Sequence, residues 1–338
     1  MTKPHLEDVA VLGSGTWGTA LAVHLGRTGH HVRLWARDAQ LAAEMKGVRV
    51  NCRYLPDVCF PERLMPTGDL EEAITGSGIV LLAVPSHGLR AVARHAVPFI
   101  PAGIIVVSTT KGIETDTLRR MSQVVSEEVG SRHPVVVVSG PSFAVEVAQG
   151  LPTAVVVAST DARAAAHVQE SFRSAAFRLY ASDDVPGVEI GGAMKNVIAI
   201  AAGAVEGLGL GHNSMAALIT RGLAEISRLA SAEGGRRDTL SGLSGLGDLV
   251  LTCTGSLSRN RYVGVELGHG RSLDEILSGM RMVAEGVRTT TAAVALGARH
   301  GVELPITAQM AAVLEGRLSP RAAVEALMGR RQRAEAEG

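Results

Sequence analysis

The sequence predicts an α/β domain followed by an all-α domain. In the first half, short β-branched runs alternate with helical segments, which is typical of βαβ units that build a parallel sheet. After residues 183–187 these runs cease, and alanine, leucine, glycine and methionine dominate to the end. A chain of 338 residues with 46% hydrophobic content is long enough for two cores. We therefore expect domains at residues 1–186 and 187–338.

Continuous apolar runs mark the expected strands of the first domain. Strands that helices cover on both faces are apolar throughout instead of alternating. The expected strands are residues 9–12, 31–35, 79–84, 104–107 and 135–138, with 154–157 and 177–180 added at a sheet edge.

The composition favours a small-molecule partner. Lysine plus arginine equals aspartate plus glutamate at 33 each, so no overall charge attracts nucleic acid or an anionic membrane. Aromatic residues, at 3%, are too few for the stacking platforms of single-strand binders. The most apolar stretch, residues 197–205, is bracketed by Lys195 and Glu206 and is much shorter than the roughly 20 residues of a membrane span.

The N-terminus and the cysteines indicate a cytoplasmic protein. The first residues lack the positive, apolar and small-residue regions of a signal peptide. Cys52, Cys59 and Cys253 are odd in number, and their spacing fits neither a metal knuckle nor a redox pair. No cluster of histidine, cysteine and acidic residues has metal-ligand spacing, so we expect no metal.

A glycine-rich segment follows the first expected strand. Gly13-Ser-Gly15-Thr-Trp-Gly18 stands directly before an apolar helix at residues 19–26. Gly13 allows the tight turn, Gly15 lets the backbone approach a pyrophosphate, and Gly18 lets the helix pack close to the strand. The helix N-terminus offers N–H groups and partial positive charge to the phosphates. The first domain is therefore expected to be a Rossmann-type dinucleotide-binding domain.

The residue after the second strand bears on the choice of cofactor. An acid there holds the ribose hydroxyls of NAD, whereas an arginine accepts the 2′-phosphate of NADP. This chain has Arg37, followed by Asp38. We expect both cofactors to be used, with a preference for NADPH. The alternative is a solvated pair in which Asp38 caps the next helix.

Three further segments carry polar residues in positions suited to a reaction. Lys111 follows the strand at residues 104–107, and the carboxyl ends of strands bind ligands in open α/β sheets. Lys195 and Asn196 stand in an otherwise apolar, small-residue helix. Asp248 follows a glycine-rich turn, and Ser258-Arg259-Asn260 offers an anion-binding fork.

Together with the glycine motif, Ser139-Gly-Pro-Ser142-Phe-Ala144 and residues 219–222 and 285–290, these segments resemble the bacterial NAD(P)-dependent glycerol-3-phosphate dehydrogenases. The resemblance covers nearly the whole chain in order. It implies interconversion of sn-glycerol 3-phosphate and dihydroxyacetone phosphate, which supplies glycerol 3-phosphate for phospholipid synthesis. It also implies a Rossmann domain followed by an all-helical domain that carries substrate and catalytic residues.

The resemblance assigns roles to individual residues. It implies that Lys195 is the proton acceptor, with Lys111 and Asp248 as its catalytic partners. The substrate contacts that it implies are Lys111, Gly140, Ser142, Lys195, Asn196, Asp248, Thr252, Ser258, Arg259 and Asn260.

The resemblance also implies a set of cofactor contacts, which includes the glycines of the motif. These contacts are Gly13, Gly15, Thr16, Trp17, Gly18, Arg37, Tyr54, Lys111, Ala144, Arg259, Val283 and Glu285.

Several of these residues also have simpler explanations that involve no catalytic role. Lys195 could lay its stem on apolar surface with its charge in water, and Asp248 could be a helix N-cap. His87 and His212 are rival bases, while Cys253 fits packing better than nucleophilic attack.

At the level of function, the rivals are a related hydroxy-acid or sugar-phosphate dehydrogenase and a non-catalytic dinucleotide-sensing protein. The second rival would keep the glycines without needing Lys111, Lys195 and Asp248 together. A homodimer is expected for an enzyme of this size.

Overall fold

The computed structural model describes residues 6–280, 283–332 and 334–335. The chain divides into two compact units. The first, here called the sheet unit, comprises Met1–Thr110 and Met121–Val185. The second, the helical unit, comprises Lys111–Arg120 and Pro186–Gly338. The short segment 111–120 thus packs with the helices, although it lies between two strands of the sheet along the chain.

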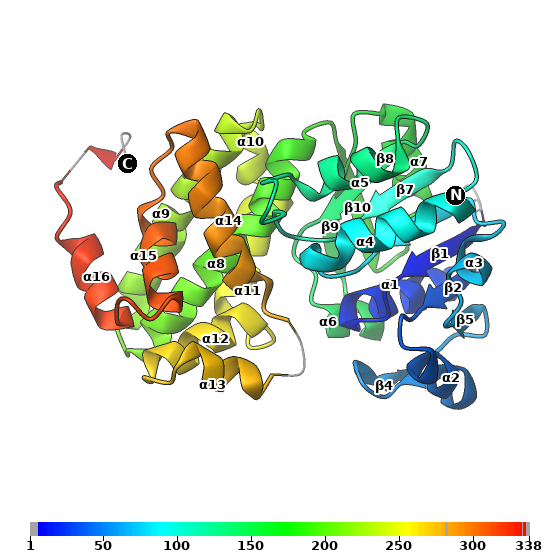
Figure 1. Ribbon diagram of the computed structural model, residues 1–338, viewed down its shortest axis with the longest axis horizontal. Coiled ribbons are helices and arrows are strands. Elements are labelled where there is room, and N and C mark those ends of the chain that lie inside the picture. The colour runs from blue at the N-terminus through cyan, green and yellow to red at the C-terminus, as the bar shows by residue number, and fades with distance from the viewer. Residues whose placement is uncertain (1–5, 281–282, 333, 336–338) are drawn as a thin grey trace. The chain divides into compact units, whose positions relative to one another are not determined.

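The sheet unit contains an eight-stranded sheet in the order β10-β9-β8-β7-β6-β1-β2-β5 (Figure 1). Neighbouring strands are parallel except β8 and β9, which are antiparallel. Every strand expected from the sequence is present, and the predicted fold class is confirmed. The strands are β1 (Asp8–Leu12), β2 (His31–Trp35), β5 (Leu64–Thr67), β6 (Ile79–Leu82), β7 (Ile105–Ser108), β8 (Val135–Ser139), β9 (Thr153–Ala158) and β10 (Phe177–Ser182).

Strand β5 and a small hairpin were not expected from the sequence. Pro66 lies within β5 and argues against a strand, but β5 is at the sheet edge, where a missing N–H donor is tolerated. The hairpin pairs β3 (Val50–Asn51) with β4 (Leu55–Cys59) in antiparallel fashion. Both elements are too short for a periodic pattern to reveal them.

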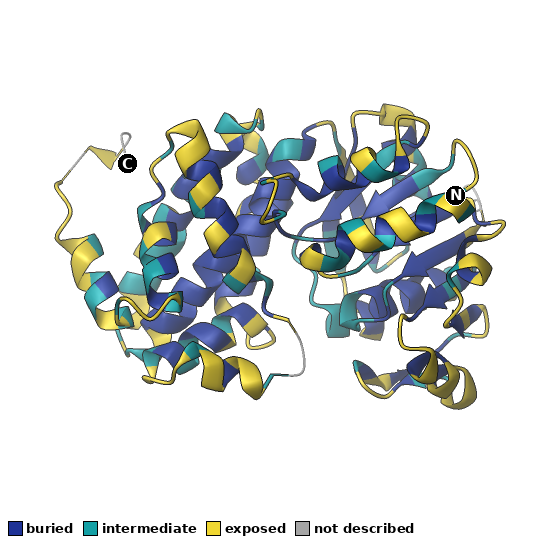
Figure 2. Ribbon diagram, in the orientation of Figure 1, coloured by how far each residue is buried: buried dark blue, intermediate teal, exposed yellow. Residues whose placement is uncertain are grey.

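Alternate residues of the central strands pack into different cores. In β1, Val9 and Val11 belong to the core that includes α1, whereas Ala10 and Leu12 belong to the core that includes α4 and α5. Helices therefore cover both faces, which explains the continuous apolar runs (Figure 2). The helices of this unit are α1 (Thr16–Arg27), α2 (Ala39–Val48), α3 (Leu70–Ile74), α4 (Ser86–Ala96), η1 (Val97–Phe99), α5 (Met121–Val129), α6 (Ala144–Gln149) and α7 (Ala162–Phe172).

The helical unit is built around α8 (Val185–Gly207), which is apolar on all sides and buried almost from end to end (Figure 2). The elements around it are α9 (Gly211–Ala232), α10 (Arg237–Leu240), η2 (Leu243–Gly247), α11 (Asp248–Thr254), α12 (Arg259–Gly268), α13 (Leu273–Ser278), α14 (Glu285–His300), α15 (Pro305–Leu314) and α16 (Pro320–Met328).

Helix α8 also corrects one argument from the sequence. The run at residues 197–205 belongs to a helix of 23 residues, which is long and apolar enough to cross a membrane. The length argument against a membrane span is therefore wrong. The most apolar window of α8 is completely buried inside the protein, and core helices commonly pass this test, so α8 is weak evidence for a span.

Glycines bring α12 into backbone contact with α8. A Cβ atom at Gly264 of α12 would overlap the carbonyl oxygen of Ile200, and one at Gly203 of α8 would overlap that of Arg261. Because α12 begins at Arg259, this contact fixes the Ser258-Arg259-Asn260 segment against the helix that carries Lys195. Only glycine permits helices to approach this closely.

We predict that Gly264→Ala destabilises the protein. Alanine normally stabilises a helix relative to glycine by about 1 kcal/mol, but here the added methyl group must push two helices apart, which typically costs about 1–3 kcal/mol. Urea unfolding would measure the change. The control is Gly279→Ala, whose Cβ would lie at an ordinary 3.6 Å from the nearest backbone oxygen. Equal stability of the two variants would show that the α8–α12 contact can relax.

Candidate active site

A buried carboxylate binds two lysines in the helical unit. Asp248, the first residue of α11, has no exposed surface. Its Oδ2 accepts a hydrogen bond from Lys111 Nζ at 2.6 Å, and its Oδ1 accepts one from Lys195 Nζ. The N-cap of α11 is Gly247, so the carboxylate of Asp248 serves the lysines and not the helix end.

Thr252 completes this cluster one turn along α11. Its hydroxyl accepts a hydrogen bond from Lys195 Nζ at 2.9 Å and donates one to the backbone oxygen of Asp248 at 2.6 Å. The structure thus brings together four residues that the sequence analysis singled out from distant segments: Lys111, Lys195, Asp248 and Thr252.

Glycines in α8 and in the turn before α11 allow these two segments to pack closely. A Cβ at Gly191 of α8 would lie 2.5 Å from the backbone oxygen of Ser244, and one at Gly245 would overlap the backbone of Leu240. The turn η2, a single π-helical turn, leads directly into Asp248. Such turns often occur at functional sites. The glycine-rich sequence before Asp248 therefore serves close packing, which puts the carboxylate against Lys195.

Burial changes the acidity of Lys195. The residue is 7% exposed, and removal of its ammonium group from water lowers its pKa to about 7, helped by the charge of Lys111 and opposed by that of Asp248. The head group is bonded inside the protein, so Lys195 is not a lysine whose charge extends into water. A lysine that is neutral near pH 7 can accept a proton.

Two asparagines link three helices beside this cluster. Asn260 Nδ2 of α12 donates to Asn196 Oδ1 of α8 at 2.9 Å, and the backbone N–H of Gly286 in α14 donates to Asn260 Oδ1 at 2.9 Å. Ser258 is the N-cap of α12, with its hydroxyl accepting from the N–H of Arg261. Between them, Arg259 has an exposed side chain.

The glycine-rich loop of the sheet unit fits a dinucleotide. Gly13 has φ +117°, a conformation that favours glycine, and a Cβ at Gly18 would overlap the carbonyl oxygen of Gly13. At Gly15 a Cβ would meet nothing within 4 Å, so space is open beside the backbone. Gly15 is also the N-cap of α1 and makes no side-chain cap hydrogen bond. The arrangement matches a loop that holds a pyrophosphate at a helix N-terminus.

Asn51 supports this loop and was missed in the sequence analysis. It is fully buried, and its Nδ2 donates to the backbone oxygen of Ser14 at 2.8 Å and to Thr19 Oγ1 at 2.9 Å. Its Oδ1 accepts from the N–H of Tyr54 at 3.2 Å, which links the loop to a residue predicted to contact the cofactor. Asn51 is a single polar residue in a strand of two residues, Val50–Asn51, which is too short to show a pattern of burial, so the sequence could not reveal it.

The end of β2 exposes a cation. Arg37 is exposed and has no hydrogen bond or ion pair within the described part of the chain. Asp38 is the N-cap of α2: its Oδ1 accepts from Gln40 and Leu41 N–H groups, and its Oδ2 pairs with Arg53 at 3.2 Å. These bonds lower the pKa of Asp38, with the backbone bond from Leu41 first among them. Both carboxylate oxygens are thus engaged in the protein.

The other predicted contacts are distributed over both units. Gly140 and Ser142 follow β8 in the sheet unit, and Ser142 Oγ donates to the backbone oxygen of Gly140 at 2.9 Å. The remaining predicted contacts are Thr16 and Trp17 at the start of α1, Tyr54 and Ala144 packed against the sheet-unit core, and Val283 and Glu285 at the start of α14.

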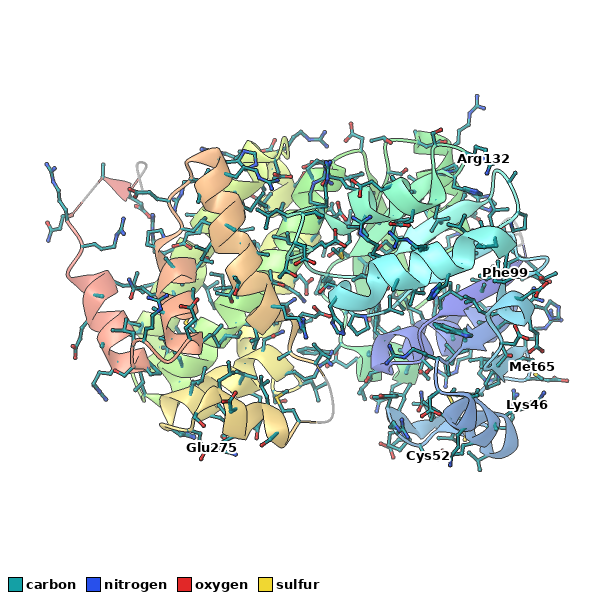
Figure 3. The ribbon with its side chains drawn as sticks, in the orientation of Figure 1. Lys46, Cys52, Met65, Phe99, Arg132 and Glu275 are labelled. Atoms are coloured by element: carbon teal, nitrogen blue, oxygen red, sulfur yellow. The ribbon has the colours of Figure 1, made fainter. Side chains whose placement is uncertain are left out.

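The structure does not favour the rival bases and the rival nucleophile. His87 and His212 are both exposed. Burial raises the pKa of the Cys253 thiol to about 12, which disfavours the reactive thiolate. Cys52, which is labelled in Figure 3, and Cys59 are both free and exposed. Within the described residues, no group of histidine, cysteine and acidic side chains could hold a metal ion.

Comparison with known proteins gives the same family as the motifs of the sequence, over nearly the full length of the chain. Residues 8–165 match the family described as NAD-dependent glycerol-3-phosphate dehydrogenase N-terminus, and residues 184–325 match the C-terminus of the same family. The glycerol-3-phosphate dehydrogenase (NAD(P)+) of Koribacter versatilis is 53% identical over 329 residues, covering 96% of this chain and 98% of the relative. That of Moorella thermoacetica is 52% identical, covering 91% of each chain.

A solved structure shows the same fold. The glycerol-3-phosphate dehydrogenase of Coxiella burnetii superposes with a TM-score of 0.93 at 43% identity, covering 96% of this chain and 99% of that one. On both sequence and structure, this chain belongs to the family of NAD-dependent glycerol-3-phosphate dehydrogenases.

Proposed function

We propose that this protein interconverts sn-glycerol 3-phosphate and dihydroxyacetone phosphate with NAD(P), and so supplies glycerol 3-phosphate for phospholipid synthesis. The observation that carries the proposal is the buried Lys195, whose pKa of about 7 suits proton transfer to and from a substrate oxygen. We further propose that the enzyme is cytoplasmic and homodimeric. Residues 1–186 would bind the dinucleotide, and residues 187–338 would supply most of the substrate and catalytic residues.

In the oxidation, the C–H bond of the substrate's middle carbon and the O–H bond of its hydroxyl group break as the carbonyl forms. A nicotinamide held by the dinucleotide-binding unit would supply the hydride chemistry by accepting the hydrogen of that carbon with its electron pair. Lys195 Nζ accepts the hydroxyl proton as the carbonyl forms, and in the reduction its ammonium group returns that proton. Asp248 orients Lys195, and the positive charge of Lys111 keeps Lys195 from holding its proton too tightly.

The phosphate group needs a cation near this site. Asn260 and Ser258 use their side chains within the protein, the first to join helices and the second to cap α12. We therefore assign the phosphate mainly to Arg259, whose exposed planar fork suits bidentate binding. The start of α12 adds the partial positive charge of a helix N-terminus.

The direct test is a cofactor assay. Mixing the protein with NADPH and dihydroxyacetone phosphate should cause the absorbance of the reduced cofactor to fall. Turnover with a different hydroxy acid or sugar phosphate, but none with dihydroxyacetone phosphate, would reassign the substrate. Cofactor binding without turnover on any of these substrates would indicate a sensing protein.

We predict that Lys195→Met lowers turnover by roughly 10²–10⁴-fold, the usual contribution of a general base, and leaves the dissociation constant of the cofactor unchanged. Steady-state kinetics and cofactor titration would measure the two effects. The control is Lys46→Met, because Lys46 is exposed on α2 (Figure 3). Turnover close to that of the parent would give the base role to another residue, with His87 next.

Replacement of Arg259 by alanine should separate phosphate binding from chemistry. Loss of hydrogen bonds to a charged group costs about 1.5–3 kcal/mol, so the KM for dihydroxyacetone phosphate should rise roughly 10- to 150-fold. The activity on unphosphorylated dihydroxyacetone should barely change. Arg321→Ala, in an exposed position on α16, is the matched control. Equal losses on both substrates would mean that Arg259 supports the fold or the cofactor instead.

Cofactor preference is expected to depend on Arg37. Since Asp38 is engaged in capping α2 and in the pair with Arg53, we predict tighter binding of NADPH than of NADH. Arg37→Ala should weaken NADPH binding by about 1.5–3 kcal/mol and change NADH binding little. Dissociation constants at one salt concentration would measure this, with Arg163→Ala as control. A parent that prefers NADH would mean that Asp38 turns toward the ribose.

A further inference from the structure

Lys111 belongs to a segment that folds back on itself within the helical unit. Ile113 and Arg120 form an antiparallel bridge, and inside it Glu114 N–H donates to the backbone oxygen of Arg119 at 2.9 Å. Ile113 is buried in the core around α8, and Leu118 packs against the same core. Lys111 lies two residues before Ile113, so the bridge limits where the ammonium group of Lys111 can lie.

Leu118 adopts an unusual backbone conformation. Its φ is +59°, in the left-handed region that branched residues rarely enter. Such a conformation persists only where surrounding contacts impose it, and it is frequent near functional sites. The loop is therefore held in one shape by its contacts with the helices.

Arg120 attaches the base of the loop to those helices. Its Nη1 donates to Glu189 Oε2 of α8 at 2.6 Å, and its Nε donates to Glu233 Oε2, at the end of α9, at 3.3 Å. Glu233 Oε1 is bonded to His300 Nε2, at the end of α14, at 2.7 Å. The Arg120 and Glu189 side chains are only 11% and 3% exposed.

A buried ion pair of this kind is weak evidence for stability. The loss of hydration of two charges offsets most of their attraction, and apolar replacements of both partners are often neutral. What the guanidinium group of Arg120 does supply is geometry, because its planar set of donors is held at two points, by Glu189 of α8 and by Glu233 at the end of α9. Glu189 lies on α8, the helix that also carries Lys195, so the pair relates the loop of Lys111 to the helix of Lys195.

We propose that Arg120 is a positioning residue, which holds Lys111 against Asp248 by attaching the loop 111–120 to Glu189 of α8. The proposal rests on the proposed function, since it concerns the charge beside the base. Without Arg120 the loop would loosen, Lys111 would leave Asp248, and Lys195 would lose a neighbouring positive charge.

The test uses the double variant Arg120→Met/Glu189→Met, which removes both charges of the buried pair and leaves Glu233 with its other partner, His300. We expect it to fold, with kcat/KM for glycerol 3-phosphate oxidation reduced about 10- to 100-fold, the loss that a misplacement of about 1 Å can cause. In the parent, we expect oxidation to rise with pH through about 7 as Lys195 loses its proton. In the variant this midpoint should move to higher pH, because removal of a nearby cation favours the protonated lysine.

A double-mutant cycle separates positioning from general structural support. Lys111→Met should by itself raise the midpoint of the pH dependence of oxidation. When the Arg120 and Glu189 changes are added to Lys111→Met, they should shift this midpoint no further. Arg119→Ala, an exposed neighbour in the same loop, should behave as the parent. If the double variant does not fold, Arg120→Lys keeps a cation for Glu189 and is expected to give a smaller shift in the same direction.

A folded Arg120→Met/Glu189→Met variant with the kcat/KM and midpoint of the parent would overturn the proposal. A shift that adds in full to that of Lys111→Met would also overturn it. Failure of the proposed function itself would look different, because the parent would then turn over neither dihydroxyacetone phosphate nor glycerol 3-phosphate.

Discussion

The buried lysine cluster of the candidate active site depends on one carboxylate that has no exposed surface. Asp248 receives hydrogen bonds from two lysines, one on each oxygen, and such a group is stable in the interior only when it is paired and bonded. The single negative charge of Asp248 cannot balance two ammonium groups. The free energy needed to remove a proton from one lysine is therefore moderate. Lys195 is the more deeply buried of the pair, and burial lowers its pKa to about 7. The same carboxylate thus holds both lysine head groups in one buried cluster.

Small residues make this arrangement possible. Helix α8 forms the centre of the helical core and also carries Lys195, and its glycines let neighbouring segments approach the backbone itself. Gly191 admits the turn before Asp248, while Gly203 admits α12 with Arg259 at its start. A larger side chain at either position would move a functional residue by the width of a methyl group. The apolar composition of α8, which resembles that of a membrane helix, follows from its burial on all sides.

In the sheet unit, the glycine-rich loop is rigid because buried polar groups hold it. Asn51 bonds the backbone of Ser14 and the hydroxyl of Thr19, and so joins the loop to the β3–β4 hairpin. At the adjoining strand end, Arg53 and the first turn of α2 engage Asp38, which leaves Arg37 as the exposed charge. Both oxygens of the Asp38 carboxylate are therefore engaged within the protein, one in capping α2 and the other in the ion pair with Arg53.

The sequence by itself determined the elements whose signal is local. Apolar runs marked the strands, the glycine spacing marked the dinucleotide loop, and the order of motifs indicated the family. Chain segments such as β5, interrupted by Pro66, and the short β3–β4 hairpin carry no such signal. Only the tertiary structure decided that residues 111–120 pack with the helices, that Asn51 is buried, and that Asn260 is bonded to Asn196. The pKa of Lys195 was decided in the same way, because burial and neighbouring charge arise from residues that are distant in the chain and meet only in the folded protein.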